Sequence, residues 1–379
     1  MPYRTGPNPP RHGPAALPCA VLLIGLALTA CGAGPAPDST LPTSAQGRTP
    51  LVVFAAGSLI LPFGELEQAF EARYPDIDVL AEYHGSIQVM RHVTELHEPI
   101  DVVATADASL IPMLMYTATV PETGRPYADW SIRFASNRLA LAHTPTSTYA
   151  GEITAANWPE ILARPDVRLG LADPRFDASG YRALMAVALM ENTSGSYDLF
   201  GPVFDGQFTF PVTIFRDDNL TTVTVPEVLE TRPEAHIVLR GGSIMLIALL
   251  ESGDLDYAFE YESVVRQHGL EWLPLPAAVN MGEPEFEPTY ETVQVNLDFQ
   301  RFSTVKPQFR GERIGYGVTV PSNAPHPQEA ALFIAFLLGP EGRAIMQADY
   351  QPLLDPCIAD GEASMPEDLQ GLCVVQDEL

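Results

Sequence analysis

The sequence predicts an α/β protein of two lobes, each a mixed sheet flanked by helices, with a ligand cleft between them. Two observations carry this expectation. Strand-like and helix-like segments alternate from Leu51 onward, and the first three strands are separated by helices, which is the pattern of a parallel sheet. A chain of 379 residues, 46% of them hydrophobic, is also long enough for two domains with sizeable cores.

The first lobe is predicted from a βαβαβ series. Strands are expected at residues 51–56, 76–83 and 100–106, with helices at 61–74, 86–96 and 109–115. In parallel sheets of this kind, ligands bind beyond the carboxyl ends of the strands. The turns that follow these strands are therefore candidate binding segments.

A second series predicts the second lobe. One long strand, 131–144, is expected to leave the first lobe, and strand 313–321 to return to it. Between them we expect helices at 181–190 and 244–252, whereas 192–235 has mixed strand and turn signals and 201–225 has no assigned role. Lobe 1 is predicted as 51–133 plus 321–350, lobe 2 as 134–320, and a C-terminal tail as 351–379. Segments 134–143 and 315–320 are the expected hinge.

The N-terminal segment has the features of a targeting signal. Arg4 and Arg11 precede an apolar run, residues 15–30, that ends in Leu-Thr-Ala before Cys31. This arrangement resembles a bacterial lipobox, in which the cysteine is lipidated after cleavage. It predicts a signal peptide over 1–30, a lipid anchor at Cys31, a flexible tether over 31–50 and an extracytoplasmic location on the cell membrane. The alternative is an ordinary secretory signal in which Cys31 is incidental.

The net charge and the cysteine content limit which classes of binding partner are expected. A net charge of −27 with only 21 basic residues argues against nucleic acid and against docking onto an anionic membrane surface. It does not exclude a small anion, because backbone dipoles hold anions without formal charge. Outside the cytosol, Cys357 and Cys373 are expected to form a disulfide. No histidine lies between them, so a metal site there is disfavoured.

Four glycine–serine turns precede predicted helices: Gly57-Ser58, Gly85-Ser86, Ser179-Gly180 and Gly242-Ser243. A helix N-terminus carries unpaired N–H groups and a partial positive charge, glycine allows close approach, and serine adds a neutral donor. Together the turns predict an oxyanion site. Each turn alone is also explained as a helix cap.

Asp177 and Tyr261 are further candidate ligand residues. A carboxylate beside an oxyanion repels it unless Asp177 accepts a proton from the ligand, as with hydrogen phosphate, or coordinates a metal centre, as in molybdate or tungstate. Asp177 could instead simply cap the helix that follows. The Tyr261 hydroxyl could donate to the ligand, or Tyr261 could be a core tyrosine. Glu260 and Glu262, on either side of it, are expected to point to the opposite face of the strand.

No pattern predicts an enzyme. The sequence contains neither G-x-S-x-G nor H-E-x-x-H. His84, His92 and His97 are spaced so that they do not share a helix face, which disfavours a metal site. A binding protein without a cofactor is the expected class.

Several blocks, in order, resemble one known family. "FAAGSLILPFGELEQAFEARYPDIDV", "HGSIQVMRHVTEL", "DVVATADASLIPMLM", "NWPEILARPDVRLGLADPRFDASGYRALM" and "LLESGDLDYAFEYESVVRQHG" are similar to the archaeal-type (WtpA-type) tungstate/molybdate-binding proteins. The resemblance extends from Leu51 to about Tyr350. It implies a type II periplasmic-binding fold and a substrate-binding component that delivers its ligand to an ABC transporter permease.

The resemblance also implies a ligand set. It assigns to the oxyanion site Gly57, Ser58, Ser86, Asp177, Ala178, Ser179 and Tyr261, with Asp177 as the ligand of the molybdenum or tungsten centre. The family glutamate that completes this coordination aligns with Ser243, so Asp177 is expected to be the sole carboxylate ligand. A monomeric carrier of tungstate or molybdate is expected. Phosphate, sulfate or another small oxyanion remains an alternative ligand, and a non-transport sensor or adhesin remains an alternative role.

Overall fold

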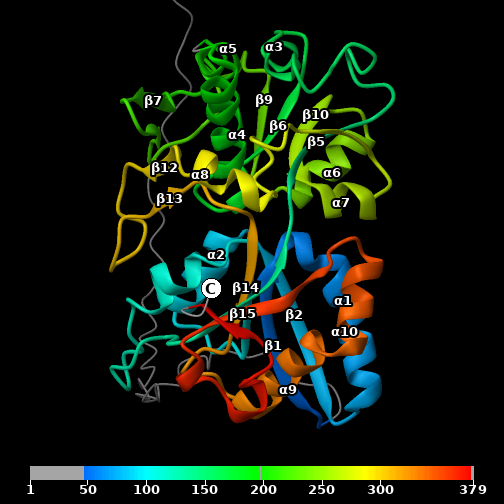
Figure 1. Cartoon of the computed structure of the whole chain (residues 1–379), viewed down its shortest axis with the longest axis vertical. Coiled ribbons are helices and arrows are strands. Elements are labelled where there is room, and N and C mark those ends of the chain that lie inside the picture. The colour runs from blue at the N-terminus through cyan, green and yellow to red at the C-terminus, as the bar shows by residue number, and fades with distance from the viewer. Residues whose placement is uncertain (1–46, 197, 377–379) are drawn as a thin grey trace, which may run out of the picture. The chain divides into compact units, whose positions relative to one another are not determined.

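The computed structural model describes residues 47–196 and 198–376, which belong to one compact unit. The predicted signal peptide, Cys31 and most of the tether lie outside the described residues. Strands of the described part form a seven-stranded, a five-stranded and a four-stranded sheet (Figure 1). The predicted α/β class, with a mixed sheet in each lobe, is confirmed.

The seven-stranded sheet forms the core of the first lobe, in the order β16-β15-β4-β14-β3-β1-β2. Strands β1, β2 and β3 are parallel, as predicted, whereas β14 and β4 run antiparallel to their neighbours. The strands are β1 (Thr49–Ala56), β2 (Ile77–His84), β3 (Val102–Thr105), β4 (Ser131–Ser136), β14 (Gly315–Thr319), β15 (Leu353–Asp360) and β16 (Val374–Val375).

Helices of the first lobe bury one apolar face each. In α1 (Ile60–Arg73), Phe63, Leu66 and Phe70 recur at helical spacing, and all three are buried. The Phe70 ring packs edge-on against Phe333, with ring centroids 5.2 Å apart. The remaining segments are η1 (Gly57–Leu59), α2 (Ser86–Thr94), η2 (Ile111–Met115), α9 (Pro327–Leu338), α10 (Pro340–Ala348), η4 (Glu362–Ser364) and η5 (Glu367–Leu369).

The second lobe contains the other two sheets. The five-stranded sheet has the order β11-β5-β10-β6-β9 and the four-stranded sheet the order β13-β12-β8-β7. Their strands are β5 (Leu139–His143), β6 (Leu169–Ala172), β7 (Thr213–Arg216), β8 (Thr221–Val225), β9 (Ile237–Arg240), β10 (Tyr257–Tyr261), β11 (Glu271–Pro274), β12 (Val293–Leu297) and β13 (Gln308–Arg310).

Helix α4 (Ala178–Ser194) packs against strands of both second-lobe sheets. Residues 178–191 are therefore buried on every side of the helix, which explains its nearly uninterrupted run of apolar and small residues. The other helical segments of this lobe are α3 (Trp158–Leu162), α5 (Phe200–Phe204), α6 (Ile244–Glu251), α7 (Glu262–Gln267), η3 (Pro284–Phe286) and α8 (Glu287–Tyr290).

The expected chain path is corrected at several points. The predicted single strand 131–144 is two strands, β4 and β5, that belong to different sheets. The break falls at Asn137, whose side chain accepts from Arg138 N and donates to Ser263 Oγ and Tyr316 Oη, so it holds a turn rather than a continuous strand. Segment 192–235, for which no sheet was predicted, supplies β7 and β8 to the four-stranded sheet.

The expected C-terminal tail is instead part of the first sheet. Strand β15 pairs with β4, and β16 pairs with β15, because alternate residues of β15 such as Cys357 and Ala359 turn apolar side chains into the core. Cys357 and Cys373 are joined by a disulfide. The predicted lobe boundaries at 134 and 320 also shift, since all of β4 and β14 belong to the seven-stranded sheet.

The described chain crosses between the lobes twice, at 137–138 and at 311–314. The first crossing lies within the predicted hinge segment 134–143, and the second directly precedes the predicted segment 315–320. Within 47–196 and 198–376, no helix combines the length and the apolar character that crossing a membrane requires.

Candidate functional site

A pocket of about 160 Å³ is lined by both lobes. Gly57 and Gly85, from the ends of β1 and β2, lie on one side of it, and Asp177 and Gly242, from the ends of α4 and α6, on the other. Glycines of three of the predicted glycine–serine turns thus line one pocket, together with Asp177. The predicted residues Ser58, Ser86, Ser179, Ser243 and Tyr261 are not among its lining residues. The remaining lining residues are Tyr83, His84, Gln88, Gly241, Ile244 and Met245.

Asp177 is the N-cap of α4, one of the roles considered from the sequence. Its Oδ1 accepts from Ser179 N and Ser179 Oγ, both at 2.8 Å, and its Oδ2 accepts from Ser243 N at 3.3 Å. Burial raises the pKa of Asp177, although these hydrogen bonds act in the opposite direction. Three hydrogen bonds therefore fix the position of the carboxyl group, and its burial favours the protonated, neutral form.

The N-terminus of α2 is occupied by a carbonyl from the other lobe. Phe176 O accepts from Ile87 N at 3.1 Å and from Gln88 N at 3.2 Å. A Cβ on Gly85 would lie 2.3 Å from this oxygen, so only glycine fits here. Gly180 is similarly close to the backbone, with its Cβ position 2.4 Å from Ala172 O. At these two turns the glycine admits protein backbone, not a ligand.

Ser86 keeps a free donor. Its Oγ accepts a hydrogen bond from Ala106 N at 3.0 Å, so its own proton remains available. Ser58 lies in the same lobe, and its Oγ is 2.8 Å from Tyr316 Oη. Both serines are buried.

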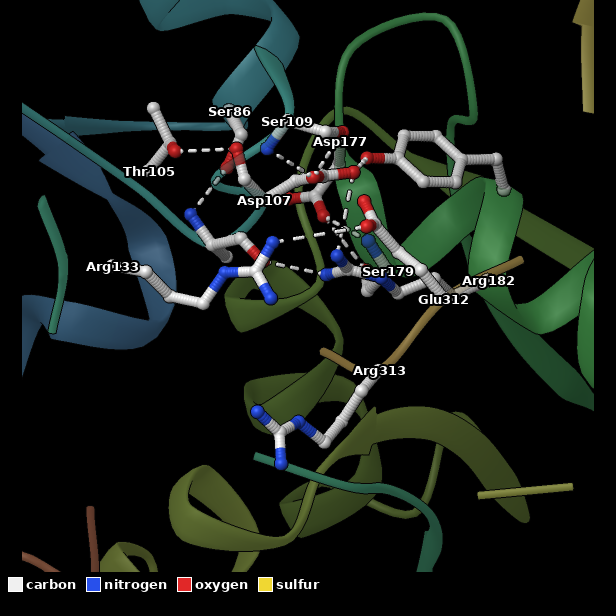
Figure 2. Close-up of polar contacts among 12 residues, drawn as sticks. Ser86, Thr105, Asp107, Ser109, Arg133, Asp177, Ser179, Arg182, Glu312 and Arg313 are labelled. Atoms are coloured by element: carbon white, nitrogen blue, oxygen red, sulfur yellow. Dashed lines mark hydrogen bonds and ion pairs between the residues drawn. The ribbon is translucent and has the colours of Figure 1, made fainter. Parts of the chain in front are cut away.

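Arg182 connects the two lobes at the centre of the site (Figure 2). From the second turn of α4, its Nη1 donates to Ala106 O and to Tyr261 Oη, both at 2.6 Å, and its Nη2 lies 3.3 Å from Asp107 Oδ2. Tyr181 Oη also donates to Asp107. Neither Arg182 nor Asp107 was predicted from the sequence as a site residue. The one available signal was an arginine inside an otherwise apolar helix.

Tyr261 is oriented by Arg182. Because its hydroxyl oxygen accepts from the guanidinium, its proton is left to donate elsewhere, as the ligand role requires. Its ring lies 6.1 Å from the Tyr316 ring. Ala106 thus joins Ser86 to Arg182, since its N–H donates to Ser86 and its carbonyl accepts from Arg182. Arg182 in turn contacts Tyr261.

Acidic groups surround this arginine. Glu312, in the second crossing, lies 3.9 Å from Arg133. Burial, followed by the neighbouring Asp107, raises the pKa of Glu312 to about 7. Figure 2 shows Asp107, Arg182 and Glu312 pointing toward one another, with Asp177 and Ser179 nearby.

Glu260 is a second buried carboxyl group near Ser243. It points to the face of β10 opposite to Tyr261, as expected, and its Oε1 accepts from Tyr261 N at 2.7 Å. Its buried Oε2 has no hydrogen-bond partner in the described part of the chain. Burial raises the pKa of Glu260 to about 8 and the charge of Asp177 adds to the effect, whereas the hydrogen bond from Tyr261 N opposes it. Ser243, which the sequence resemblance aligned with the family glutamate, thus lies near a glutamate of β10.

Other predicted residues take structural roles or lie elsewhere. Ala178 is the buried first residue of α4. His84 and His92 stack with ring centroids 4.8 Å apart, and no group of three potential metal ligands forms among the described residues. Cys31 lies outside them.

Comparison with known proteins places the chain in a family. The model of the bacterial extracellular solute-binding proteins matches residues 51–349. The chain belongs to this family. It is therefore a solute-binding protein and not an enzyme.

Relatives of this solute-binding protein are similar over nearly their full lengths. It is 35% identical to the molybdate/tungstate-binding protein WtpA of Thermococcus kodakarensis, over 94% of this chain and 96% of the relative. It is 36% identical to an uncharacterized solute-binding protein of Methanoculleus marisnigri, over 93% of this chain and 96% of that one. The resemblance found in the sequence blocks is confirmed.

A solved structure with the same fold is the sulfate-binding protein SubI of Mycobacterium tuberculosis. It matches with a TM-score of 0.53 at 14% identity, over 82% of this chain and 88% of SubI. At that identity the likeness shows the fold alone, which is the two-lobed fold of periplasmic binding proteins.

Proposed function

We propose that this solute-binding protein captures molybdate or tungstate outside the cytoplasm and delivers it to an ABC transporter permease. The relative from Thermococcus kodakarensis, which carries the name of a molybdate/tungstate-binding protein, supports the ligand. The observation that carries the proposal is the pocket itself, whose walls come from both lobes and include the turns that precede α2, α4 and α6.

Polar groups around the pocket favour a ligand that only accepts hydrogen bonds. Ser86 and Tyr261 each accept from a protein donor and so retain a proton to donate. Arg182 supplies a buried positive charge beside them. Unprotonated tetrahedral oxyanions present only acceptor oxygens, so such donors suit them.

Asp177 supplies what would distinguish a metal-centred oxyanion from sulfate. A carboxylate repels a sulfate dianion but can donate electron density to molybdenum or tungsten. We infer that Asp177 is the carboxylate ligand, because its Oδ2 has only the 3.3 Å contact with Ser243 N, whereas Oδ1 has two shorter ones. Ser243 then takes the position of the family glutamate and supplies a hydrogen-bond donor near the ligand instead of a carboxylate.

Calorimetry tests the ligand and the role of Asp177 together. Tungstate, molybdate, sulfate and phosphate are titrated separately into the purified protein near neutral pH. We expect tight binding of tungstate or molybdate, weak binding of sulfate, and a loss of at least roughly tenfold in tungstate affinity for Asp177→Ala. Asp218→Ala, an exposed position in the β7–β8 turn, is the matched control and should bind as the wild type does.

Three results would contradict the ligand, the function or the role of Asp177. Binding of phosphate alone would make Asp177 a proton acceptor and change the ligand. Binding of none of the four anions would favour a sensor or an adhesin that keeps the fold. Unchanged tungstate affinity in Asp177→Ala would remove Asp177 from the ligand set.

We further propose that Cys31 carries a lipid that anchors the protein to the membrane through the tether, as a monomer. The sequence pattern before Cys31 supports this. Mass spectrometry of the membrane fraction should find a lipid-modified Cys31 at the mature N-terminus. A Cys31→Ala variant that stays in the membrane fraction would contradict the anchor.

A further inference from the structure

Two arginines pack on the ring of Phe176, outside the pocket lining, and a third lies close enough for its charge to act on one of them. They are Arg91 on α2, Arg175 in the turn before α4, and Arg301 in the connection between β12 and β13. The Cζ atoms of Arg301 and Arg175 lie 4.3 Å and 5.4 Å from the centroid of the Phe176 ring. Burial, followed by the charge of Arg91 and that of Arg175, lowers the pKa of Arg301 to about 10. The charges of Arg91 and Arg175 therefore act on Arg301, whose guanidinium shares the Phe176 ring with that of Arg175.

The positive charge of this arginine cluster is only partly balanced. Asp173 is the carboxylate within its reach, and Arg175 binds it through Nε at 2.9 Å and Nη2 at 2.6 Å. Arg301 makes no such pair: its Nε and Nη2 are buried without a hydrogen-bond partner in the described segments, and so is Arg91 Nε. A buried charged donor that lacks an acceptor destabilises the fold.

The cluster is assembled from both lobes. Arg91 belongs to the first lobe, and Arg175 and Arg301 to the second. Ser303, two residues after Arg301, donates from N and Oγ to Glu95 Oε1 at 3.0 and 3.2 Å, which fixes the connection against the end of α2. Phe176 O caps the start of the same helix. The contacts that join the lobes therefore also bring like charges together.

We propose that the arginine cluster is a second anion site, which takes a small inorganic oxyanion such as sulfate or phosphate between the lobes. An oxyanion there accepts from the unpartnered guanidinium nitrogens and neutralises charges that otherwise repel. Because it contacts both lobes, it stabilises the arrangement in which they are joined. The site goes beyond the proposed function and does not depend on which ligand fills the pocket.

Thermal unfolding of the purified protein in sulfate tests the site, with chloride of equal ionic strength as the reference. We expect sulfate to raise the melting temperature of the wild type more than chloride does. Arg301→Gln should lose this difference, and its sulfate affinity should fall at least roughly tenfold, since one charged donor pair is removed. Arg91→Gln is the second variant, in case Arg301→Gln folds poorly.

Two control variants and a crystal soak complete the test. Arg310→Gln changes an exposed arginine on the neighbouring strand β13, 3.8 Å from Glu291, and should respond to sulfate as the wild type does. Asp177→Ala, which impairs the proposed pocket, should also keep the sulfate response. A crystal soaked in selenate should show an anomalous peak at the arginine cluster.

Equal stabilisation of the wild type and Arg301→Gln by sulfate would overturn the proposal, as would a selenate peak confined to the pocket or no sulfate effect on any variant. Failure of the proposed function gives a different result. In that case tungstate and molybdate do not bind the wild type, while the sulfate response still depends on Arg301 and Arg91.

Discussion

At the scale of single residues, Arg182 explains how the site is held together. Its guanidinium contacts a carbonyl, a hydroxyl and a carboxylate. The carbonyl and the carboxylate belong to the first lobe, and the hydroxyl belongs to the second. Such a buried charge is tolerated because each side of it meets an acceptor. It also orients Tyr261, so one residue positions both the positive charge and a donor.

Removal of this arginine should be costly. In Arg182→Met, Asp107 loses its cation, although Tyr181 Oη and the N and Oγ of Ser109 still donate to it. We expect the free energy of unfolding, measured by chemical denaturation, to fall by about 3 kcal/mol. The double variant Arg182→Met/Asp107→Asn should recover part of this loss, because no uncompensated charge remains. If the double variant is less stable than Arg182→Met, the ion pair is not the source of the effect.

Glu260 predicts a pH dependence of stability. Its pKa is about 8 in the folded protein against an ordinary 4.5, so between these values the folded state binds more protons than the unfolded state. The free energy of unfolding should therefore fall as pH rises through this window, by up to about 1.4 kcal/mol per pH unit. Glu260→Gln should flatten the profile, whereas Glu262→Gln, its neighbour in sequence, should not. An unchanged slope in Glu260→Gln would contradict this.

At the scale of elements, the N-terminus of α2 and the turn before α4 form a backbone contact between the lobes. The turn contributes a carbonyl that two amides of α2 share, and glycine at position 85 is what permits the approach. Because the φ and ψ of Gly85 are −61° and 142°, alanine can adopt this backbone conformation. The obstacle to a side chain is thus the opposite lobe alone.

Gly85→Ala should therefore separate folding from closure. We expect the free energy of unfolding to change by less than about 1 kcal/mol, and tungstate affinity to fall at least roughly tenfold, because the Cβ collides with Phe176 O. Gly64→Ala, in the middle of α1 with nothing near its Cβ position, is the control and should bind normally. Calorimetry and denaturation together measure both quantities. Equal affinities of the two variants would refute the closure argument.

At the scale of the whole molecule, two crossings join the lobes and the pocket lies between them. A ligand that contacts both walls stabilises the closed arrangement relative to an open one. Asn137 lies at the first crossing and is bonded to both Tyr316 and Ser263, so small rotations there change the distance between the lobes.

Small-angle scattering should detect this closure. Saturating tungstate is expected to reduce the radius of gyration of the wild type, because the lobes approach one another. Gly85→Ala should contract less at the same occupancy. A wild-type profile that does not change with saturating ligand would argue against hinge closure.

Local sequence patterns by themselves determined the elements and their class. The helix predicted at 86–96 is α2, and that at 244–252 is α6, each within about a turn of its observed end. Burial periodicity and cap residues are local, so they are visible without the fold. The turns after β1 and β2, and Asp177 at the start of α4, were found for the same reason.

Tertiary structure alone decided which strands share a sheet and what surrounds each polar group. The break at Asn137, the addition of β15 and β16 to the first sheet, and the four-stranded sheet all depend on partners distant in sequence. The same holds for Arg182 beside Asp107, for Glu260 beside Ser243, and for the arginine cluster. An isolated arginine or glutamate in a sequence carries no sign of its burial or its neighbours, because desolvation and Coulomb interactions act through space and not along the chain.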